Sequence, residues 1–249
     1  MLPLIDRGTG EPTFVLMHFF GNSHREWLEV IPHLESTCRC VALDLPGFGD
    51  AADEQHFDVR SMADRVEATI EGLGLSRVVL VGHSFSGKIA MLLASRRPAW
   101  LESLILVAPA PAGPQPVSDA ERSFQEAFDH GRAQAESFIE GAITGEISAA
   151  RYEDAVNDAM RASPDAWQAW PRSGSREDFA EEVGVIDYPT IVIVGDRDPS
   201  LPPQTQRELV LNQFRAPRFE IMPGFGHLLP MEMPETLAGL MRAFVELEP

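Results

Sequence analysis

The sequence predicts an α/β fold in which a mostly parallel, doubly wound sheet carries an inserted helical segment. Short apolar runs rich in β-branched residues alternate with amphipathic stretches through the first 110 residues, a pattern typical of a parallel sheet with helices on both faces. A Pro/Gly-rich break at 108–116 then begins a stretch without strand-like runs, and the strand pattern resumes at 190. We therefore expect a core formed by residues 1–112 and 188–249, with a helical cap at 113–187.

The N-terminal part contains the first predicted strands. Leu2–Ile5 and Thr13–Met17 are short apolar runs, and the glycines and proline between them predict a hairpin turn. A strand is also predicted at Cys38–Leu43. Apolar residues at helical spacing predict helices over about 24–34 and 61–73.

The stretch from Arg77 to Ala94 predicts a buried strand, a sharp turn and a helix, with Ser84 at the turn. The strand is apolar and β-branched, and an apolar helical face follows at once. Such a reversal predicts a strained backbone at residue 84 and small residues two positions before and after it, which are Gly82 and Ser86. Another short apolar run, Leu101–Val107, precedes the break.

The inserted segment shows helical signals only. Ser118 and Glu121 form a capping box, and Ser163 precedes a helix that carries Trp167 and Trp170. These aromatic side chains either line a substrate pocket or form the core of the segment itself, and both interpretations stay open. Residues 113–187 include 16 acidic and 6 basic residues, a balance of -10, which we expect on a solvated outer face.

The charge and the cysteines limit the classes of partner. Twenty basic and 38 acidic residues give a formal net charge of -18, which disfavours binding to nucleic acid or to an anionic membrane. Cys38 and Cys40 are predicted to be reduced core thiols, because two positions apart on one strand do not suit a disulfide. No apolar stretch is long enough to span a bilayer, and the N-terminus lacks a signal pattern, so we expect a cytoplasmic location. Lys88, the only lysine, is expected to bury its stem or form a salt bridge.

Gly82-His83-Ser84-Phe85-Ser86 resembles the nucleophile elbow of the α/β-hydrolases, G-x-S-x-G, with Ser86 in place of the second glycine. The resemblance implies that Ser84 is a nucleophile placed at the N-terminus of a helix, where an anion is stabilised. Ser86 is the alternative. A turn centred on it would put Lys88 where a small residue is required, so we prefer Ser84.

Two loops after earlier strands also resemble loops of this family. His18-Phe19-Phe20-Gly21-Asn22-Ser23 resembles its H-G-x-x-G-S loop, which implies that the backbone N–H groups of Phe20 and Phe85 form an oxyanion hole. Phenylalanine replaces the family's glycine at position 19, so Phe19 is the alternative donor. His18 is expected to anchor this loop. Asp44 begins a segment that resembles D-x-P-G-x-G and is expected to hold its own loop.

The last two predicted strands, Thr190–Val194 and Arg218–Met222, run into loops that resemble the family's acid and histidine loops. These loops supply Asp198 and His227, which implies the triad Ser84, Asp198 and His227 in the family's chain order. Asp196 is the alternative acid. In a doubly wound sheet all of these residues follow carboxyl ends of strands, where ligands bind.

The resemblance therefore implies an α/β-hydrolase fold and a serine hydrolase that acts through an acyl-enzyme, with no metal or organic cofactor. We expect a small-molecule substrate, namely a small to medium apolar carboxylic ester or lactone. The residues predicted to bind it are aromatic: Phe19, Phe225, Trp167 and Trp170. Three alternatives share these motifs, namely carbon–carbon bond hydrolysis, cofactor-free perhydrolysis and a ligand receptor built on the hydrolase fold.

Overall fold

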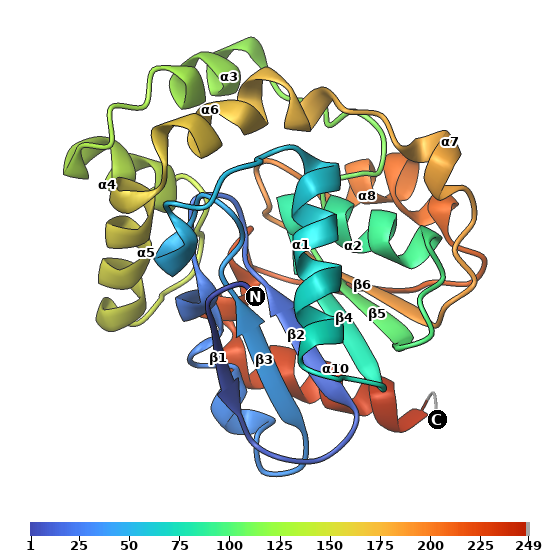
Figure 1. Ribbon diagram of the computed structural model, residues 1–249. Helices are drawn as coiled ribbons and strands as arrows, with labels where there is room; N and C mark the ends of the chain where they lie inside the picture. Colours follow the sequence, from blue (N-terminus) through green and yellow to red (C-terminus); the bar gives the residue numbers. More distant parts are fainter. Residues whose placement is uncertain (248–249) are drawn as a thin grey trace.

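A seven-stranded sheet lies at the centre of the computed structural model, which describes residues 1–247 (Figure 1). The strand order is β1-β3-β2-β4-β5-β6-β7, and β1 alone among them is antiparallel to its neighbour. The strands are β1 (Leu4–Arg7), β2 (Thr13–Met17), β3 (Arg39–Leu43), β4 (Val78–His83), β5 (Leu101–Val107), β6 (Thr190–Gly195) and β7 (Arg218–Met222).

Both faces of the sheet are buried, which explains the continuous apolar runs. In β2, Val15 and Met17 pack on one face, whereas Phe14 and Leu16 pack on the other, and all four are fully buried. Helices α1 (Val59–Gly72) and α2 (Phe85–Ser95) cover the first face, and α10 (Pro234–Leu247) covers the second. The two shorter helices α8 (Pro203–Leu209) and α9 (Leu229–Glu232) follow β6 and β7. The predicted α/β architecture is thus confirmed.

Five helices connect β5 to β6; the first four lie over the carboxyl ends of the strands, and the fifth lies beside α2 (Figure 1). They are α3 (Asp119–Glu126), α4 (Arg132–Glu140), α5 (Ala149–Arg161), α6 (Pro164–Arg172) and α7 (Ala180–Val183). Ser118 and Ser163 accept a backbone N–H at the N-termini of α3 and α6, as their sequence signals predict. We call residues 113–187 the helical segment; its status as a separate cap domain stays a prediction.

The predicted hairpin is wrong, because β1 does not pair with β2. Strand β2 pairs on one edge with β3 and on the other with β4, so neither edge is left for β1, which pairs with β3 instead. The helix expected over 24–34 is also wrong. Two short 3-10 helices, His24–Trp27 and Ile31–His33, replace it, and Pro32 lacks the N–H that a continuous α-helix would use at that position.

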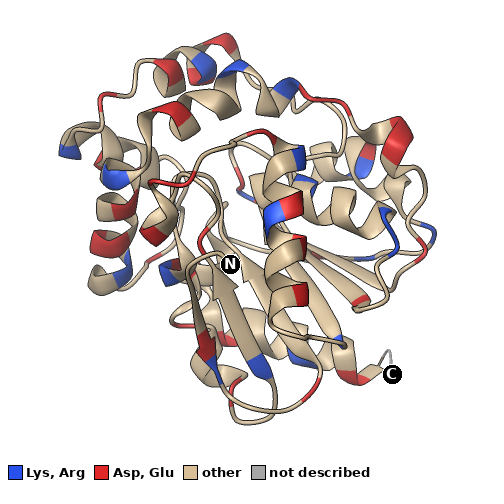
Figure 2. Cartoon of the chain, viewed as in Figure 1, with Lys and Arg blue, Asp and Glu red and all other residues tan. Residues whose placement is uncertain are grey.

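The acidic residues are spread over the helical segment and recur along α3, α5 and α7 (Figure 2). Many of them pair with arginine at the surface, for example Glu153 with Arg132 and Glu182 with Arg60. Among residues 1–247, no helix is both long enough and apolar enough to cross a lipid bilayer.

Candidate active site

Ser84 lies at a strained turn between β4 and α2. Its backbone has φ 55° and ψ -120°, a conformation that residues with a Cβ rarely adopt. The turn is tight enough that a Cβ on Gly82 would lie 2.7 Å from the carbonyl oxygen of Ser86. Ser84 keeps 8% of its surface exposed and lines a cavity, so its hydroxyl is accessible to a small molecule.

The hydroxyl of Ser86 is fully hydrogen-bonded within the turn, and Ser86 does not line the cavity. Its hydroxyl accepts the N–H of His83 at 2.9 Å and lies within hydrogen-bond distance of the carbonyl oxygens of Met17 and His83. The residue is fully buried. Ser86 therefore stabilises the turn, and of the two serines only Ser84 faces the cavity.

His227 and Asp198 are joined by a short hydrogen bond. The Nδ1 atom of His227 donates to Oδ2 of Asp198 at 2.7 Å, and the other carboxylate oxygen accepts the N–H groups of Ser200 and Leu201 at 2.9 and 2.8 Å. With its proton on Nδ1, the imidazole leaves Nε2 as a free acceptor. His227 and Ser84 line the same cavity, but no hydrogen bond joins their side chains within residues 1–247.

The surroundings shift the pKa values of this pair in opposite directions. Burial alone would raise the pKa of Asp198, but the neighbouring His227 and the hydrogen bonds to the carboxylate lower it below its usual range. Burial alone would lower the pKa of His227, but the charge of Asp198 and the hydrogen bond to it raise the pKa above the ordinary histidine value. Asp198 is thus held as an anion that stabilises a protonated His227.

Asp196, the alternative acid, has a different role. It is exposed at the surface, and its Oδ1 atom accepts the N–H of Gly224 at 2.7 Å. That contact fixes the turn that leads to His227 without touching the imidazole. Of the two acids considered, the structure brings Asp198 to the histidine.

In the loop after β2, the two candidate oxyanion donors, the N–H groups of Phe19 and Phe20, have different surroundings. The N–H of Phe19 donates to Oε2 of Glu26 at 2.9 Å and is therefore occupied. Within residues 1–247 the N–H groups of Phe20 and Phe85 have no hydrogen-bond acceptor. Phe19 has no positive φ, whereas Gly21 has a φ of 80°. Of the two candidates Phe19 and Phe20, it is therefore Phe20 whose N–H is free.

Glu26 is a site residue that the sequence interpretation missed. It is 1% exposed, and its second carboxylate oxygen lies 2.8 Å from Nδ1 of His83. The other nitrogen of His83 lies 2.9 Å from the carbonyl oxygen of His227. Glu26 thus connects the loop of Phe20 to the turn of Ser84 and to the loop of His227. No motif marks it, since His83 lies 57 residues away along the chain.

Replacing Glu26 with alanine should lower the free energy of unfolding by about 3 to 5 kcal/mol, because the substitution leaves the N–H of Phe19 and the Nδ1 atom of His83 buried without a partner. Urea denaturation measures the change. Glu29→Ala is the matched control, since Glu29 is half-buried and contacts only groups near the surface, Ser148 and Arg151. We expect about 1 kcal/mol or less for it. Equal losses in the two variants would contradict the role of Glu26.

The cavity beside Ser84 has a volume of about 380 Å³ and a mixed aromatic and polar wall. Phe19, Phe20 and Trp170 line it, as do Phe124 and Phe138, which the sequence interpretation did not single out. The polar lining residues are Ser84, Gln115, Glu121, Gln125, Ser137, Ser200 and His227.

Two predicted substrate-binding residues lie elsewhere, which corrects the expected pocket wall. Trp167 is fully buried in the helical segment, where its ring stacks on Phe128 at 3.8 Å and its Nε1 donates to the carbonyl oxygen of Gln125. Phe225 packs with the apolar cluster on the α10 face of the sheet. For Trp167 the alternative interpretation, a core residue of the segment, is the one that its surroundings fit.

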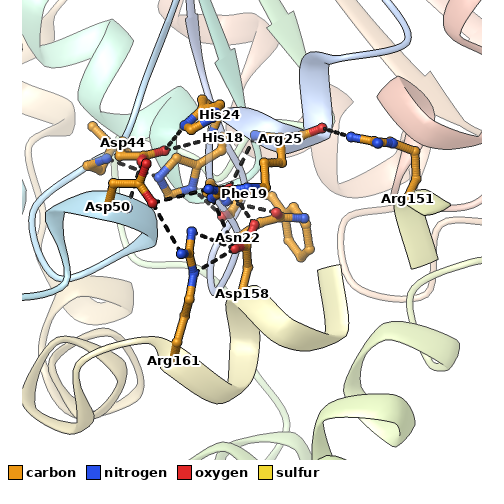
Figure 3. A network of polar contacts seen from close by, with 12 residues as sticks. His18, Phe19, Asn22, His24, Arg25, Asp44, Asp50, Arg151, Asp158 and Arg161 are labelled. Carbon is orange, nitrogen blue, oxygen red and sulfur yellow. Dashed lines mark hydrogen bonds and ion pairs between the residues drawn. The ribbon is translucent and has the colours of Figure 1, made fainter. Parts of the chain in front are cut away.

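Asp44 and His18 hold the loops beneath the cavity (Figure 3). Asp44 accepts the N–H groups of His24 and Asp50 at 2.6 and 2.7 Å and lies 2.9 Å from Nδ1 of His24. His18 accepts the N–H of Leu45 on Nε2, so its Nδ1 donates to the carbonyl oxygen of Phe19. The expectation that both residues anchor loops is confirmed.

The same network contains the one group of side chains in residues 1–247 with the spacing of metal ligands. Donor atoms of His24, Asp44 and Asp50 lie within 4.8 Å of one another. However, Asp44 is already surrounded by the N–H donors described above, and Asp50 pairs with Arg25 and Arg161, both at 3.1 Å (Figure 3). These contacts satisfy the carboxylates, so we assign no metal ligands here.

Three of the contact sites between the helical segment and the core involve buried residues. Asp158 of α5 accepts the hydroxyl of Ser23 and pairs with Arg25 (Figure 3). Lys88 of α2 is fully buried, and its Nζ donates to the carbonyl oxygens of Gly174 and Glu177 at 3.2 and 2.8 Å. Burial lowers the pKa of Lys88 to about 8. Its stem is buried as expected, but its partners are carbonyl groups.

The third contact lies at the histidine loop. The N–H of His227 donates to the carbonyl oxygen of Ala142, in the loop after α4, at 2.9 Å. Glu232 of α9 accepts backbone N–H groups from both sides of this contact. They belong to Gly145 (2.8 Å), Thr144 (3.1 Å), Gly226 (3.2 Å) and Leu228 (3.2 Å). Glu232 therefore ties the helical segment to the loop that carries His227.

Comparison with known proteins places the sequence in a family. Residues 14–240 match the sequence model of the family described as "Alpha/beta hydrolase family". The pimeloyl-[acyl-carrier protein] methyl ester esterase of Neisseria meningitidis serogroup C is 27% identical over 93% of this chain and 92% of its own length. The dihydrolipoyllysine-residue acetyltransferase component of the acetoin cleaving system of Pseudomonas putida is 27% identical over 96% of this chain, which spans 64% of that protein.

A solved structure shows the same fold. The bromoperoxidase from Bacillus anthracis superposes with a TM-score of 0.88, at 21% sequence identity, over 98% of this chain and 94% of that protein. This likeness therefore covers both the sheet and the helical segment.

Proposed function

The chain belongs to the alpha/beta hydrolase family, and we propose that it is a serine hydrolase that cleaves small to medium carboxylic esters or lactones through an acyl-enzyme. The observation that carries the proposal is the hydrogen bond between Asp198 and His227 on the wall of the cavity that also holds Ser84. The esterase from Neisseria meningitidis supports ester cleavage as the reaction.

In the proposed mechanism, Nε2 of His227 takes the proton of the Ser84 hydroxyl as its oxygen attacks the ester carbonyl. The N–H groups of Phe20 and Phe85 stabilise the oxyanion, each by about 2.7 to 4 kcal/mol in the transition state. His227 then gives its proton to the departing alcohol, and water hydrolyses the acyl-enzyme with His227 as the base. The hydrogen bond between Ser84 and His227 forms on substrate binding, since such contacts are often long in a free enzyme.

The proposal is tested by offering the purified protein two kinds of substrate. We expect turnover of p-nitrophenyl acetate and p-nitrophenyl butyrate, which are activated esters small enough for the cavity. A vinylogous diketone, the substrate type of carbon–carbon bond hydrolases, should react at least about 100-fold more slowly by kcat/KM, which corresponds to about 2.7 kcal/mol of transition-state discrimination. Faster cleavage of the diketone would replace the proposed reaction with carbon–carbon bond hydrolysis.

A further inference from the structure

Helix α3 presents two polar side chains to the catalytic cavity. Glu121 and Gln125 are four residues apart, so they project from the same face of the helix. Both line the cavity together with Ser84 and His227. The proposed mechanism uses neither of them.

Among residues 1–247, the side-chain oxygens of Glu121 and Gln125 have no hydrogen-bond partner. Gln125 is only 7% exposed, yet its Oε1 atom is buried without a hydrogen bond. Within residues 1–247 the carboxylate of Glu121 forms neither a hydrogen bond nor a salt bridge, although its own N–H donates to Ser118. The capping box is therefore half formed, and the carboxylate that could complete it is left for the cavity. Glu121 is half-buried, whereas Oε1 of Gln125 is a buried acceptor without a donor, which is rare in proteins.

The one basic side chain on the cavity wall, among the described residues, is His227, and it already pairs with Asp198. No lysine or arginine lines the cavity in the described part of the chain, and Arg122, the next residue, is bound to Pro171 and Ser175. Burial raises the pKa of Glu121, so its carboxylate would be stabilised by a cation in the cavity. The aromatic rings of Phe124, Phe138 and Trp170 on the same wall can also contact a cation favourably.

We propose that Glu121 and Gln125 form a specificity subsite for esters that carry a protonated amine. The ammonium group donates hydrogen bonds to the two side-chain oxygens and balances the charge of Glu121, while the ester carbonyl lies at Ser84. The balance of -10 on the helical segment attracts such substrates and repels anionic ones. This inference rests on the proposed function, since it defines the substrate class of the same site.

The test uses esters of the same shape that differ in charge. One series consists of 4-(ammoniomethyl)phenyl, 4-ethylphenyl and 4-(carboxymethyl)phenyl butyrate, with the charge on the leaving group. The other compares p-nitrophenyl 4-(ammoniomethyl)benzoate with p-nitrophenyl 4-ethylbenzoate, with the charge on the acyl group. In at least one series we expect kcat/KM to be about 10-fold higher for the ammonium ester than for its ethyl analogue, as a hydrogen bond to a charged group would produce. The carboxymethyl ester should be the poorest substrate.

Glu121→Gln should remove this preference. We expect kcat/KM for the ammonium ester to fall about 10-fold, with the ethyl ester changed by less than about 2-fold. Gln125→Met, which removes the amide oxygen at similar volume, should also weaken the ammonium ester selectively. Glu126→Gln is the matched control, because it removes one negative charge from an exposed position of the same helix. It should change the preference by less than about 2-fold, since exposed charges are screened.

The outcomes separate this inference from the proposed function. If the ethyl esters are hydrolysed in a Ser84-dependent way but neither series shows a preference for the ammonium ester, the hydrolase stands and the subsite does not. Equal losses for both esters in Glu121→Gln, or the same change in Glu126→Gln, also overturn the subsite. Calorimetric binding of the same ester pairs to Ser84→Ala gives the comparison without turnover. Tighter binding of the ammonium ester would support the subsite even if the hydrolase proposal failed.

Discussion

Replacing Ser84 with alanine should lower kcat for p-nitrophenyl butyrate by about 10⁶-fold, the order of loss when the nucleophile of a serine hydrolase is removed. The substitution deletes only the hydroxyl oxygen and keeps the Cβ, so the backbone strain at residue 84 stays the same. The melting temperature should therefore change by no more than a few degrees. Steady-state kinetics with the ester and thermal denaturation measure the two effects.

Ser137→Ala is the matched control for this prediction. Ser137 lines the same cavity but lies on α4, away from the turn of Ser84. We expect its kcat to stay within about 3-fold of the wild-type value, since no transition-state contact is removed. If Ser84→Ala keeps most of the activity, Ser84 is not the nucleophile and the proposed mechanism fails.

Replacing Asp198 with asparagine should lower kcat by about 10⁴-fold, the effect of disturbing the histidine tautomer in a triad. An asparagine amide can donate to Nδ1 of His227, which would move the imidazole proton to Nε2, where it cannot accept the proton of Ser84. Asp196→Asn is the control, because Asp196 is two positions away and contacts Gly224 instead. We expect the kcat of Asp196→Asn to change by less than about 10-fold. A larger loss in Asp196→Asn than in Asp198→Asn would exchange the roles of the two acids.

The pH dependence of kcat/KM supplies a second readout for Asp198. The base must be neutral, so activity falls as the pH drops through the pKa of His227. Asp198 raises that pKa, and the inflection in the wild-type enzyme should therefore lie above the ordinary histidine value. Without the charge of Asp198 the pKa falls, and the residual activity of Asp198→Asn should inflect at a lower pH. An unchanged inflection would show that Asp198 does not stabilise the protonated imidazole.

The sheet and the residues at its carboxyl edge were predictable because each depends on a local pattern. A predicted strand that runs directly into Ser84, or within a few residues into Asp198 or His227, places that residue at the carboxyl edge of the sheet. The strain at Ser84 follows from the short distance between β4 and α2. The hairpin failed for the opposite reason, since the partner of β1 depends on strand β3, which comes later in the chain.

The wall of the cavity was less predictable, because it depends on how helices far apart in sequence pack together. Trp167 and Trp170 lie on the same helix at helical spacing, yet one is in the core of the segment and the other faces the cavity. Glu26 and Glu121 carry no motif for their roles. Glu26 contacts His83, and Glu121 lines the same cavity as Ser84 and His227. No local sequence pattern connects these distant positions.

The contact between Ala142 and the N–H of His227 has a consequence for chimaeras in which the helical segment is exchanged between related enzymes. The histidine loop is held partly by the insertion, and Glu232 binds N–H groups of both. A graft that replaces residues 113–187 would place a foreign loop against the N–H of His227 and the carboxylate of Glu232. A successful transplant therefore has to preserve the path of residues 142–145 along with residue 232, even where the intended change concerns only which molecules are accepted.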